Sequence, residues 1–345
     1  MANTPKNILV IRMSALGDVA MTIPVLHSIK QQYPNVSITV ISKPWMKPLF
    51  NEIGVDFIGI EKREGLKGGV DLIRFFNKVK RMKKWDMVID LHDVIVSKIL
   101  KVLFRASGIP VKVIDKGRRA KKELVRTDNK IFKQLPTTFQ RYAKVFDEAG
   151  LPVDINFKTI YPAQQPLTQQ ILSITGNKNG KWIGIAPFAQ HRGKVYPIEK
   201  IEEVAKHFSS SDENKVILFG GGAKEVEILS SWEMKYPNMV SVAGKIRLGQ
   251  ELLLMSYLDV MVSMDSANMH LASLSAVPVV SVWGATHPFA GFYGWNQAPE
   301  NIVQLDLPCR PCSVYGNKEC LWKDYRCMND ISPKLVIDKI EEIIK

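Results

Sequence analysis

The sequence predicts an α/β protein built from two doubly wound, Rossmann-like domains, on the strength of three observations. The chain has 345 residues, enough for two domains of ordinary size. Short β-branched runs alternate with helical patterns in each half, as in parallel sheets covered by helices. Between the halves, residues 151–180 break this alternation with three prolines and a polar, glycine-flanked turn.

The first half opens with a predicted strand at residues 7–11, followed by an amphipathic stretch to about residue 33. Pro24 implies that this helix starts late or kinks. The remaining elements expected in this half are strands at 36–42, 56–60 and 87–91, helical patterns at 45–53 and 94–106, and a basic stretch at 66–85.

The second half restarts the same alternation. Strands are expected at 182–186, 216–219, 239–242, 260–264 and 279–283, and helices at 198–208, 224–234, 250–258, 268–275 and 333–344. We therefore expect domains at residues 1–165 and 166–330, with a C-terminal helix in 331–345 that packs as a brace. Such domains bind ligands at the carboxyl ends of their strands.

Composition describes a soluble globular protein with an uneven charge. Hydrophobic residues make up 46% of the chain and charged residues 23%, and no apolar run approaches the ~18 to 20 residues that span a bilayer. The N-terminus lacks a signal-peptide pattern, so we expect a cytoplasmic protein. Residues 1–150 hold 28 basic and 14 acidic residues, against 19 and 20 in the remainder. The excess of basic residues in the first half would attract nucleic acid, an acidic membrane or a phosphorylated substrate. Alternatively, these residues form a solvated, lysine-rich face that has no partner.

Two polar segments that follow predicted strands are candidates for catalysis. Residues 12–18 read RMSALGD, where Gly17 can adopt backbone conformations that other residues avoid. Asp18 could act as a general base on a hydroxyl, or could offset the dipole at a helix N-terminus. In the loop 186–197, Lys194 could neutralise a diphosphate, or could be an ordinary solvated lysine.

Two further segments are candidates for ligand binding. Residues 219–227 contain three consecutive glycines, which would admit a ligand close to the backbone or form a tight turn without one. The sequence lacks G-x-G-x-x-G, which disfavours a dehydrogenase. In residues 263–272, the backbone N–H groups and the Ser266 hydroxyl at a helix start form an anion site that Asp265 could orient. His270, one helical turn further on, would face the same anion site or serve a structural role.

The cysteines are all late in the chain, in the pattern C-x2-C-x7-C-x6-C at Cys309, Cys312, Cys320 and Cys327. The spacing permits a zinc knuckle, while a reduced, partly buried cluster is the alternative. We assign no metal and no cofactor. A chain otherwise free of cysteine is unlike a disulfide-stapled secreted protein.

Together these segments resemble the bacterial lipopolysaccharide heptosyltransferases of glycosyltransferase family nine, over nearly the whole chain. The most specific part is VSMDSANMHLASLSAVPVVSVWGATHP with the following GFYGWNQ, within residues 262–297. ILVIRMSALGDVAMTIPVL near the N-terminus is a second signature, and the late CRPC…C…CMNDISP is also similar to members of the family.

This resemblance implies a GT-B fold, two Rossmann-like domains facing across a cleft, with the acceptor on the N-terminal domain and the nucleotide sugar on the C-terminal one. It implies an inverting, metal-independent transfer of a heptose from ADP-heptose to the lipopolysaccharide inner core. Asp18 matches the family's catalytic carboxylate, and Lys194 matches the lysine that stabilises the leaving diphosphate. The donor-binding residues that it implies are Glu225, Glu227, Ile246, Asp265, Ser266, Ala267 and His270.

The basic first half fits an anionic acceptor, for which we expect Arg63, Arg118 and Arg119 to be binding residues. Other basic residues should face the cytoplasmic surface of the inner membrane, and no nucleic acid is expected. Three departures from the family pattern touch the donor site: Phe188 and Ala189 replace hydroxyl residues, Ala267 replaces a glycine, and the triple glycine is one residue longer. Two alternatives stay open: a family member with another nucleotide sugar or envelope acceptor, and a non-catalytic protein that binds nucleotides or nucleic acid.

Overall fold

The computed structural model describes residues 5–61 and 69–345, and the chain divides into two compact units. The first unit contains Met1–Lys116 and Pro136–Lys158, and the second contains Gly117–Leu135 and Thr159–Lys345. The chain therefore enters the second unit twice. The boundary expected at residue 165 lies near the second entry, whereas the excursion of residues 117–135 was not anticipated from the sequence.

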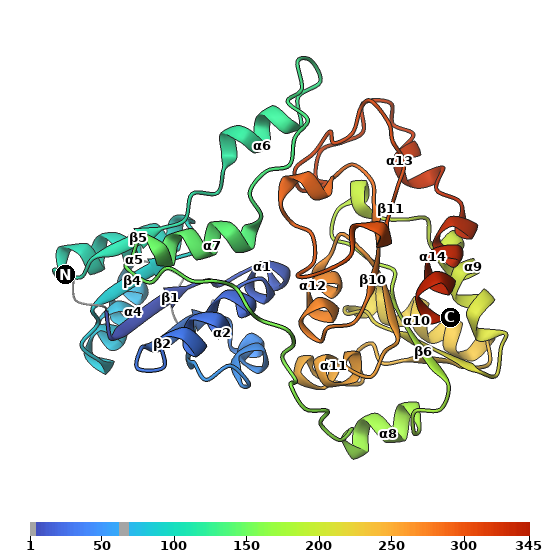
Figure 1. The fold of residues 1–345 in the computed structure, drawn as a ribbon, viewed down its shortest axis with the longest axis horizontal. Coiled ribbons are helices and arrows are strands. Elements are labelled where there is room, and N and C mark those ends of the chain that lie inside the picture. Colours follow the sequence, from blue (N-terminus) through green and yellow to red (C-terminus); the bar gives the residue numbers. More distant parts are fainter. Residues whose placement is uncertain (1–4, 62–68) are drawn as a thin grey trace. The chain divides into compact units, whose positions relative to one another are not determined.

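The first unit is built on a five-stranded sheet of order β3-β2-β1-β4-β5, in which all pairings are parallel (Figure 1). Its strands are β1 (Asn7–Ile11), β2 (Ser37–Ser42), β3 (Asp56–Gly59), β4 (Met87–Asp90) and β5 (Val111–Val113). The four strands predicted in this half are confirmed. The three-residue β5 is too short to show a periodicity of its own.

Helices cover both faces of this sheet. They are α1 (Leu16–Ala20), α2 (Ile23–Gln32), the 3-10 helix η1 (Pro44–Phe50), α4 (Gly69–Met82), α5 (Ile95–Ala106) and α7 (Thr138–Asp147). Pro24 is the second residue of α2, so the predicted amphipathic stretch consists of two helices and not one. Strand order reverses at β1, and right-handed crossovers therefore place α4 and α5 on one face and α2 on the other.

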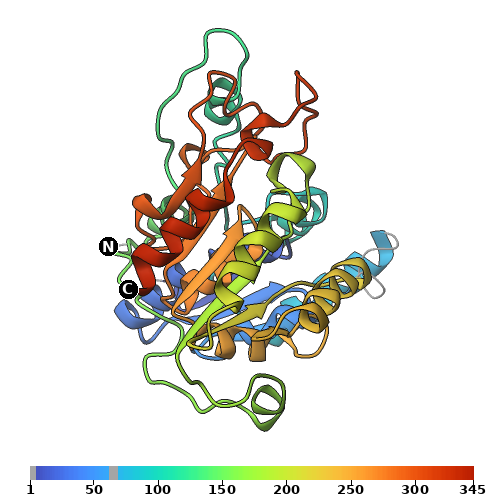
Figure 2. The same cartoon turned by 90° about the vertical axis from the view of Figure 1, so that its right-hand side faces the viewer.

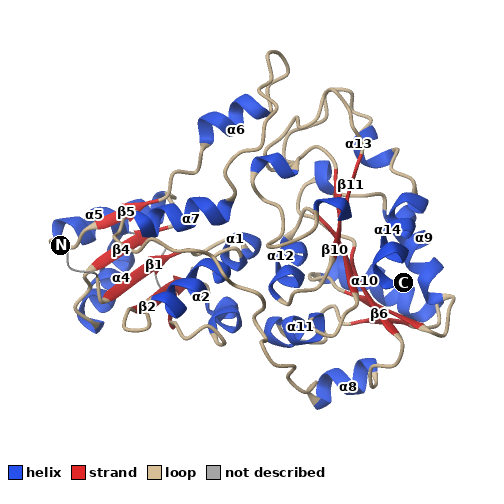
Figure 3. Ribbon diagram, viewed as in Figure 1, coloured by secondary structure: helices blue, strands red, loops and turns tan. Residues whose placement is uncertain are grey.

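The second unit carries a six-stranded parallel sheet of order β11-β10-β9-β6-β7-β8. Its strands are β6 (Lys181–Ala186), β7 (Asn214–Leu218), β8 (Met239–Ser241), β9 (Val260–Met264), β10 (Val279–Trp283) and β11 (Ile302–Gln304). Its helices are α6 (Arg118–Leu124), α8 (Gln169–Thr175), η2 (Arg192–Lys194), α9 (Ile198–Ser209), α10 (Ala223–Lys235), α11 (Leu248–Met255), α12 (Ala267–Leu274), η3 (Pro288–Ala290), η4 (Pro299–Asn301), α13 (Arg326–Asn329) and α14 (Pro333–Ile344). Figure 3 shows the strands of this unit, in red, flanked by its helices.

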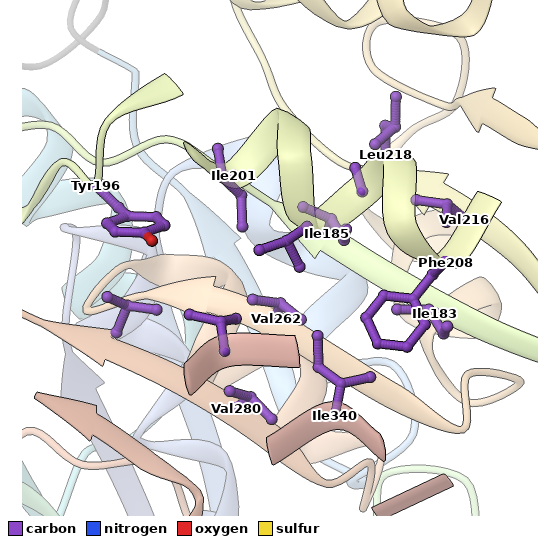
Figure 4. Close-up of a cluster of buried hydrophobic side chains, with 14 of the residues drawn as sticks. Ile183, Ile185, Tyr196, Ile201, Phe208, Val216, Leu218, Val262, Val280 and Ile340 are labelled. Carbon is purple, nitrogen blue, oxygen red and sulfur yellow. The ribbon is translucent and has the colours of Figure 1, made fainter. Parts of the chain in front are cut away.

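The central strands of the second sheet are buried on both faces, which explains why they read as continuous apolar runs. Ile183, Ile185, Val262 and Val280 from the sheet meet Phe208 from α9 in one core (Figure 4). The C-terminal helix α14 packs beside α9 and contributes the fully buried Val336 and Ile340 (Figure 2). The helix predicted at the C-terminus is confirmed, and it braces the second core.

The first sheet has a separate core, in which Leu9, Ile11 and Val88 pack against Phe76 of α4 and Phe104 of α5. Within residues 5–61 and 69–345, no helix combines the length and the apolar character needed to cross a bilayer.

Ile340→Ala should destabilise the second unit by about 2–5 kcal/mol, because it leaves a cavity in a fully buried site of the core. Urea unfolding monitored by tryptophan fluorescence measures the effect. Leu335→Ala on the same helix is the control, since Leu335 is exposed and its truncation should cost well under 1 kcal/mol. Equal losses in the two variants would show that α14 does not brace the core through Ile340.

Candidate functional site

Each sheet has one topological switch point, which is the pair of adjacent strands at which the strand order reverses. The loops that follow these two strands lead to opposite faces of the sheet, so a ligand can bind between them. In the first sheet this point lies between β1 and β4, and in the second between β6 and β9. Asp18 follows β1, Lys194 follows β6, and Asp265 follows β9. Three of the residues singled out from the sequence therefore stand where this fold class binds ligands.

Asp18 is fixed by Arg12, which directly follows β1. The Arg12 guanidinium is almost fully buried and donates through Nη1 to the Leu91 carbonyl at 2.6 Å. Its Nη2 lies 2.5 Å from Asp18 Oδ2. Asp18 itself is third in α1 and also accepts the Ala15 N–H at 3.3 Å, which is the helix-start role that the sequence allowed. About a third of its side chain remains exposed, at 32%, so a bound hydroxyl can reach the carboxylate.

Helix α7 supports this arrangement from a distant part of the chain. The hydroxyl of Tyr142, a fully buried residue, donates to the Asp18 carbonyl at 3.1 Å. The Tyr142 ring lies 5.9 Å from the Arg12 guanidinium carbon. Burial raises the pKa of Tyr142, so its hydroxyl stays a donor at physiological pH. Gly17, by contrast, is an ordinary helical residue of α1, and the conformational freedom expected of it is not used.

His92, which follows β4, holds the loop before Asp18 and was not singled out from the sequence. Its Nδ1 accepts the Met13 N–H at 3.4 Å, and its Nε2 lies 3.3 Å from Ser14 Oγ. Burial, with Arg12 and Lys116 nearby, lowers the pKa of His92 to about 4. The ring is therefore neutral at pH 7, and because Nδ1 accepts, Nε2 carries the proton and donates to Ser14.

In the second unit, Lys194 and Asp265 form an ion pair across the switch point, with Lys194 Nζ 2.8 Å from Asp265 Oδ2. The Lys194 side chain is 15% exposed and that of Asp265 only 5%. The more exposed lysine is thus oriented by a buried carboxylate.

Helix α12 begins immediately after this pair and offers its backbone N–H groups. Ser266 is the N-cap residue, but its hydroxyl lies 3.1 Å from Ser263 Oγ and does not cap the helix. Ala267 is the first helical residue and is partly exposed, whereas His270 is buried one turn further along. The N–H groups of the first turn and the Lys194 ammonium together suit a phosphate or diphosphate.

The glycine-rich segment forms a turn that Glu225 closes. Gly222 has a φ of +95°, and Glu225 Oε2 accepts the Gly221 N–H at 2.7 Å. Glu227 lies exposed on α10, and Ile246 is buried. Glu225 thus closes the tight turn that the three consecutive glycines allowed.

The segment that contains the cysteines holds Lys194 in place, which the sequence did not indicate. The Gly193 N–H donates to the Gly316 carbonyl at 3.3 Å, and Ser313 Oγ accepts the Gly316 N–H at 3.0 Å. A Cβ at position 316 would lie 2.6 Å from Lys194 Cγ, so only glycine leaves room for the lysine stem. Buried Arg310 donates to the carbonyls of Gly284 and Thr286, which ties this segment to the end of β10.

The four cysteines are free thiols that line one pocket together with Arg310 and Trp322. Burial raises the pKa of Cys327 to about 11, so this thiol is protonated at neutral pH. Among the residues that the structure describes, no three His, Cys, Asp or Glu side chains are arranged to hold a metal ion.

The arginines expected at the acceptor are spread over the chain. Arg63 lies outside the described residues. Arg118 and Arg119 begin α6, which packs within the second unit through Leu124 and through Lys121 over the Phe292 ring at 4.1 Å. Arg119 also pairs with Glu123 at 3.2 Å. By its contacts α6 therefore belongs with the second unit, and not with the N-terminal half that the sequence assigned to it.

The chain is similar to known glycosyltransferases. A model of glycosyltransferase family 9 (heptosyltransferase) matches residues 73–323. The chain is 25% identical over 337 residues to lipooligosaccharide heptosyltransferase 2 of Campylobacter jejuni, covering 95% of this chain and 96% of the relative.

Two solved structures share the fold over nearly their full lengths. A family 9 glycosyl transferase from Veillonella parvula is similar with a TM-score of 0.73 and 20% identity, covering 98% of this chain and 97% of that one. The ADP-heptose lps heptosyltransferase II of E. coli has a TM-score of 0.68 and 20% identity, with 98% of each chain covered. The fold is the GT-B fold that the resemblance implied.

Gly316→Ala should weaken binding of a nucleoside diphosphate by about tenfold or more, because the new methyl displaces the Lys194 stem. Isothermal titration measures the affinity. Gly108→Ala is the matched control, since Gly108 has a similar φ of +78° but open space around its Cβ position. The two variants share the backbone strain of about 1–2 kcal/mol, and only Gly316→Ala should lose affinity. Undiminished affinity in Gly316→Ala would mean that this glycine does not position Lys194.

His92→Gln should reduce the loss of folding stability that the protein shows as the pH falls below about 6.5. His92 binds a proton below pH ~6.5 in the unfolded chain but only below about 4 in the folded one, so its contribution to stability is lost as pH falls between these values. The loss amounts to about 2–3 kcal/mol. Urea unfolding at pH 7.5 and pH 4.5 tests this, because the pH 7.5 comparison reports only the lost hydrogen bonds. If the free energy of unfolding falls by the same amount from pH 7.5 to pH 4.5 in His92→Gln as in the wild type, His92 is not held neutral in the folded protein.

Proposed function

The chain belongs to glycosyltransferase family 9, and on that premise we propose that it transfers a heptose from ADP-heptose to the inner core of lipopolysaccharide. One observation supports the proposal most directly. The partly exposed carboxylate of Asp18, fixed by Arg12, lies at the switch point of the first sheet. The ammonium of Lys194 lies at the switch point of the second sheet, next to the start of α12, which no side chain caps. Inverting sugar transfer requires these two groups, a base for the acceptor hydroxyl and positive charge for the leaving diphosphate.

The donor in this proposal binds to the second unit. Its diphosphate accepts hydrogen bonds from the N–H groups of the N-cap residue Ser266 and the first helical residue Ala267, and it meets the ammonium of Lys194. Asp265 orients that ammonium. Glu225 or Glu227 would meet the ribose, with Ile246 near the base and His270 supporting the phosphate loop. The C. jejuni and E. coli relatives, named for heptose transfer, support ADP-heptose as the donor.

The reaction proceeds by a single displacement. Asp18 accepts the proton of the acceptor hydroxyl, and that oxygen attacks the anomeric carbon from the side opposite the diphosphate. The bond from the anomeric carbon to the phosphate oxygen breaks, and ADP leaves with the electron pair. Lys194 and the α12 N–H groups stabilise the negative charge that develops there. These groups supply the positive charge that a divalent metal provides in other transferases, so we propose that none is needed.

The acceptor in this proposal is anionic and lipid-borne, and the enzyme works at the cytoplasmic face of the inner membrane. The basic excess in residues 1–150 supports both statements. We propose Arg63, Arg118 and Arg119 as contacts to acceptor phosphates.

The test compares two variants in two assays. Asp18→Asn should keep ADP affinity but lower transfer by ~10²-fold or more, since a general base contributes about 10²–10⁴. Lys194→Ala should lower ADP affinity and transfer together, by ~10- to 100-fold. Lys178→Ala is the matched control, because Lys178 forms an ion pair of the same 2.8 Å length, with Asp259. Near-normal transfer in Asp18→Asn would return Asp18 to its helix-start role, and a donor preference for another nucleotide sugar would refute ADP-heptose.

A further inference from the structure

Helix α5 has two apolar faces, and only one of them is buried. Leu100 and Phe104 pack into the core of the first unit. On the opposite side, Ile95, Ile99 and Val102 follow at helical spacing and are 78%, 42% and 61% exposed. A single exposed apolar residue is common, but an outward row on a helix that already has a buried face needs an explanation.

The neighbouring helix α4 carries further exposed apolar residues. The rings of Phe76 and Phe104 make a T-shaped contact with centroids 4.9 Å apart, so α4 and α5 lie side by side (Figure 1). Val70 and Ile73 of α4 are 64% and 47% exposed. We call the five residues Val70, Ile73, Ile95, Ile99 and Val102 the α4–α5 ridge.

The ridge is set among positive charges. Helices α4 and α5 carry seven basic residues and one acidic residue, Asp71. The basic residues are Arg74, Lys78, Lys80, Arg81, Lys98, Lys101 and Arg105. Apolar side chains among lysines and arginines characterise helices that lie in the surface of an anionic bilayer. A second copy of the chain would bring two basic surfaces together, which like charges disfavour.

The position of the ridge in the fold links it to the candidate site. All five residues precede the Phe76–Phe104 pair on their helices, toward the sheet edge where β3 and β4 end. Ile95 is three residues after His92, which contacts Ser14 in the loop that leads to Asp18. A bilayer against the ridge would therefore lie at the same edge of the first sheet as Asp18.

We propose that the α4–α5 ridge is a membrane-docking surface, which inserts its apolar side chains among the acyl chains of an anionic bilayer while the flanking basic residues bind lipid phosphates. It deepens the proposed function, on which it rests for the idea of a lipid-borne acceptor. The ridge holds the first unit at the surface where the acceptor sugar emerges, so that the acceptor reaches Asp18 without leaving the membrane.

The experiment is sedimentation of the purified full chain with vesicles of phosphatidylethanolamine and phosphatidylglycerol, compared with vesicles of phosphatidylcholine. The wild-type protein should bind the anionic vesicles. The double variant I95Q/V102Q should bind at least ~10-fold more weakly at low and high salt alike, because apolar insertion is not screened. The double variant K98E/K101E should lose binding strongly at low salt, by roughly fivefold or more per residue, and little at 0.5 M salt.

Met234→Gln is the control for surface hydrophobicity, since Met234 is 83% exposed on α10 of the second unit and should leave vesicle binding unchanged. Ile95 and Val102 are solvent-exposed, so thermal unfolding of I95Q/V102Q should match the wild type. The proposal is overturned if the wild type stays in the supernatant, or if I95Q/V102Q sediments like the wild type. It is also overturned if the wild type is a dimer in solution that this variant dissociates.

An activity assay separates this inference from the proposed function. I95Q/V102Q should transfer heptose to a delipidated, water-soluble acceptor at the wild-type rate but work at least ~10-fold more slowly on acceptor in vesicles. Loss of both activities in this variant would overturn the docking role. If the wild-type enzyme transfers no heptose to the soluble acceptor, the proposed function fails, whereas the vesicle-binding result stands on its own.

Discussion

Both candidate sites depend on one constraint of parallel sheets. Strands that run in the same direction end at the same edge, and only where strand order reverses do the connecting loops diverge and leave room for a ligand. The first sheet reverses between β1 and β4, where Arg12 reaches the Leu91 carbonyl across the two strand ends. The second reverses between β6 and β9, where Lys194 reaches Asp265 in the same way.

The two ion pairs share a design in which a buried charge orients a more exposed one. Arg12 and Asp265 are nearly inaccessible, while Asp18 and Lys194 keep a larger part of their side chains open. Burying a charge is costly unless it is paired and hydrogen-bonded, and each buried member here has its partner. The benefit of such a pair is a fixed position for the exposed group more than added stability. In the proposed reaction, Asp18 and Lys194 are the groups that meet substrate, so the buried partners hold them ready.

In the cysteine-containing segment, the residues with the clearest structural role are not the cysteines that form its most recognisable sequence pattern. Its C-x2-C spacing suggests metal binding, yet the clearest structural contribution comes from Arg310, Ser313 and Gly316. Arg310 ties the segment to the loop after β10, and Gly316 leaves the space that the Lys194 stem fills. The segment therefore holds Lys194 in place through close packing and contacts to the backbone, which leave no periodic or compositional signal in the sequence.

The sequence by itself determined the two doubly wound units, nearly every strand of their cores, and the loops that carry Asp18, Lys194 and Asp265. Buried parallel strands read as apolar runs, and the loops after them are polar, so both leave local patterns. The strands β5 and β11 are too short to leave such a pattern in the sequence. The roles of Tyr142, His92 and Gly316 leave no local pattern either, because each of these residues contacts another that is far away in the chain. The assignment of α6 to the second unit and the exposure of Ile95 and Val102 were likewise decided by tertiary structure. An apolar residue on a helix reads the same whether it faces the core or the solvent, and only packing against the rest of the chain distinguishes the two.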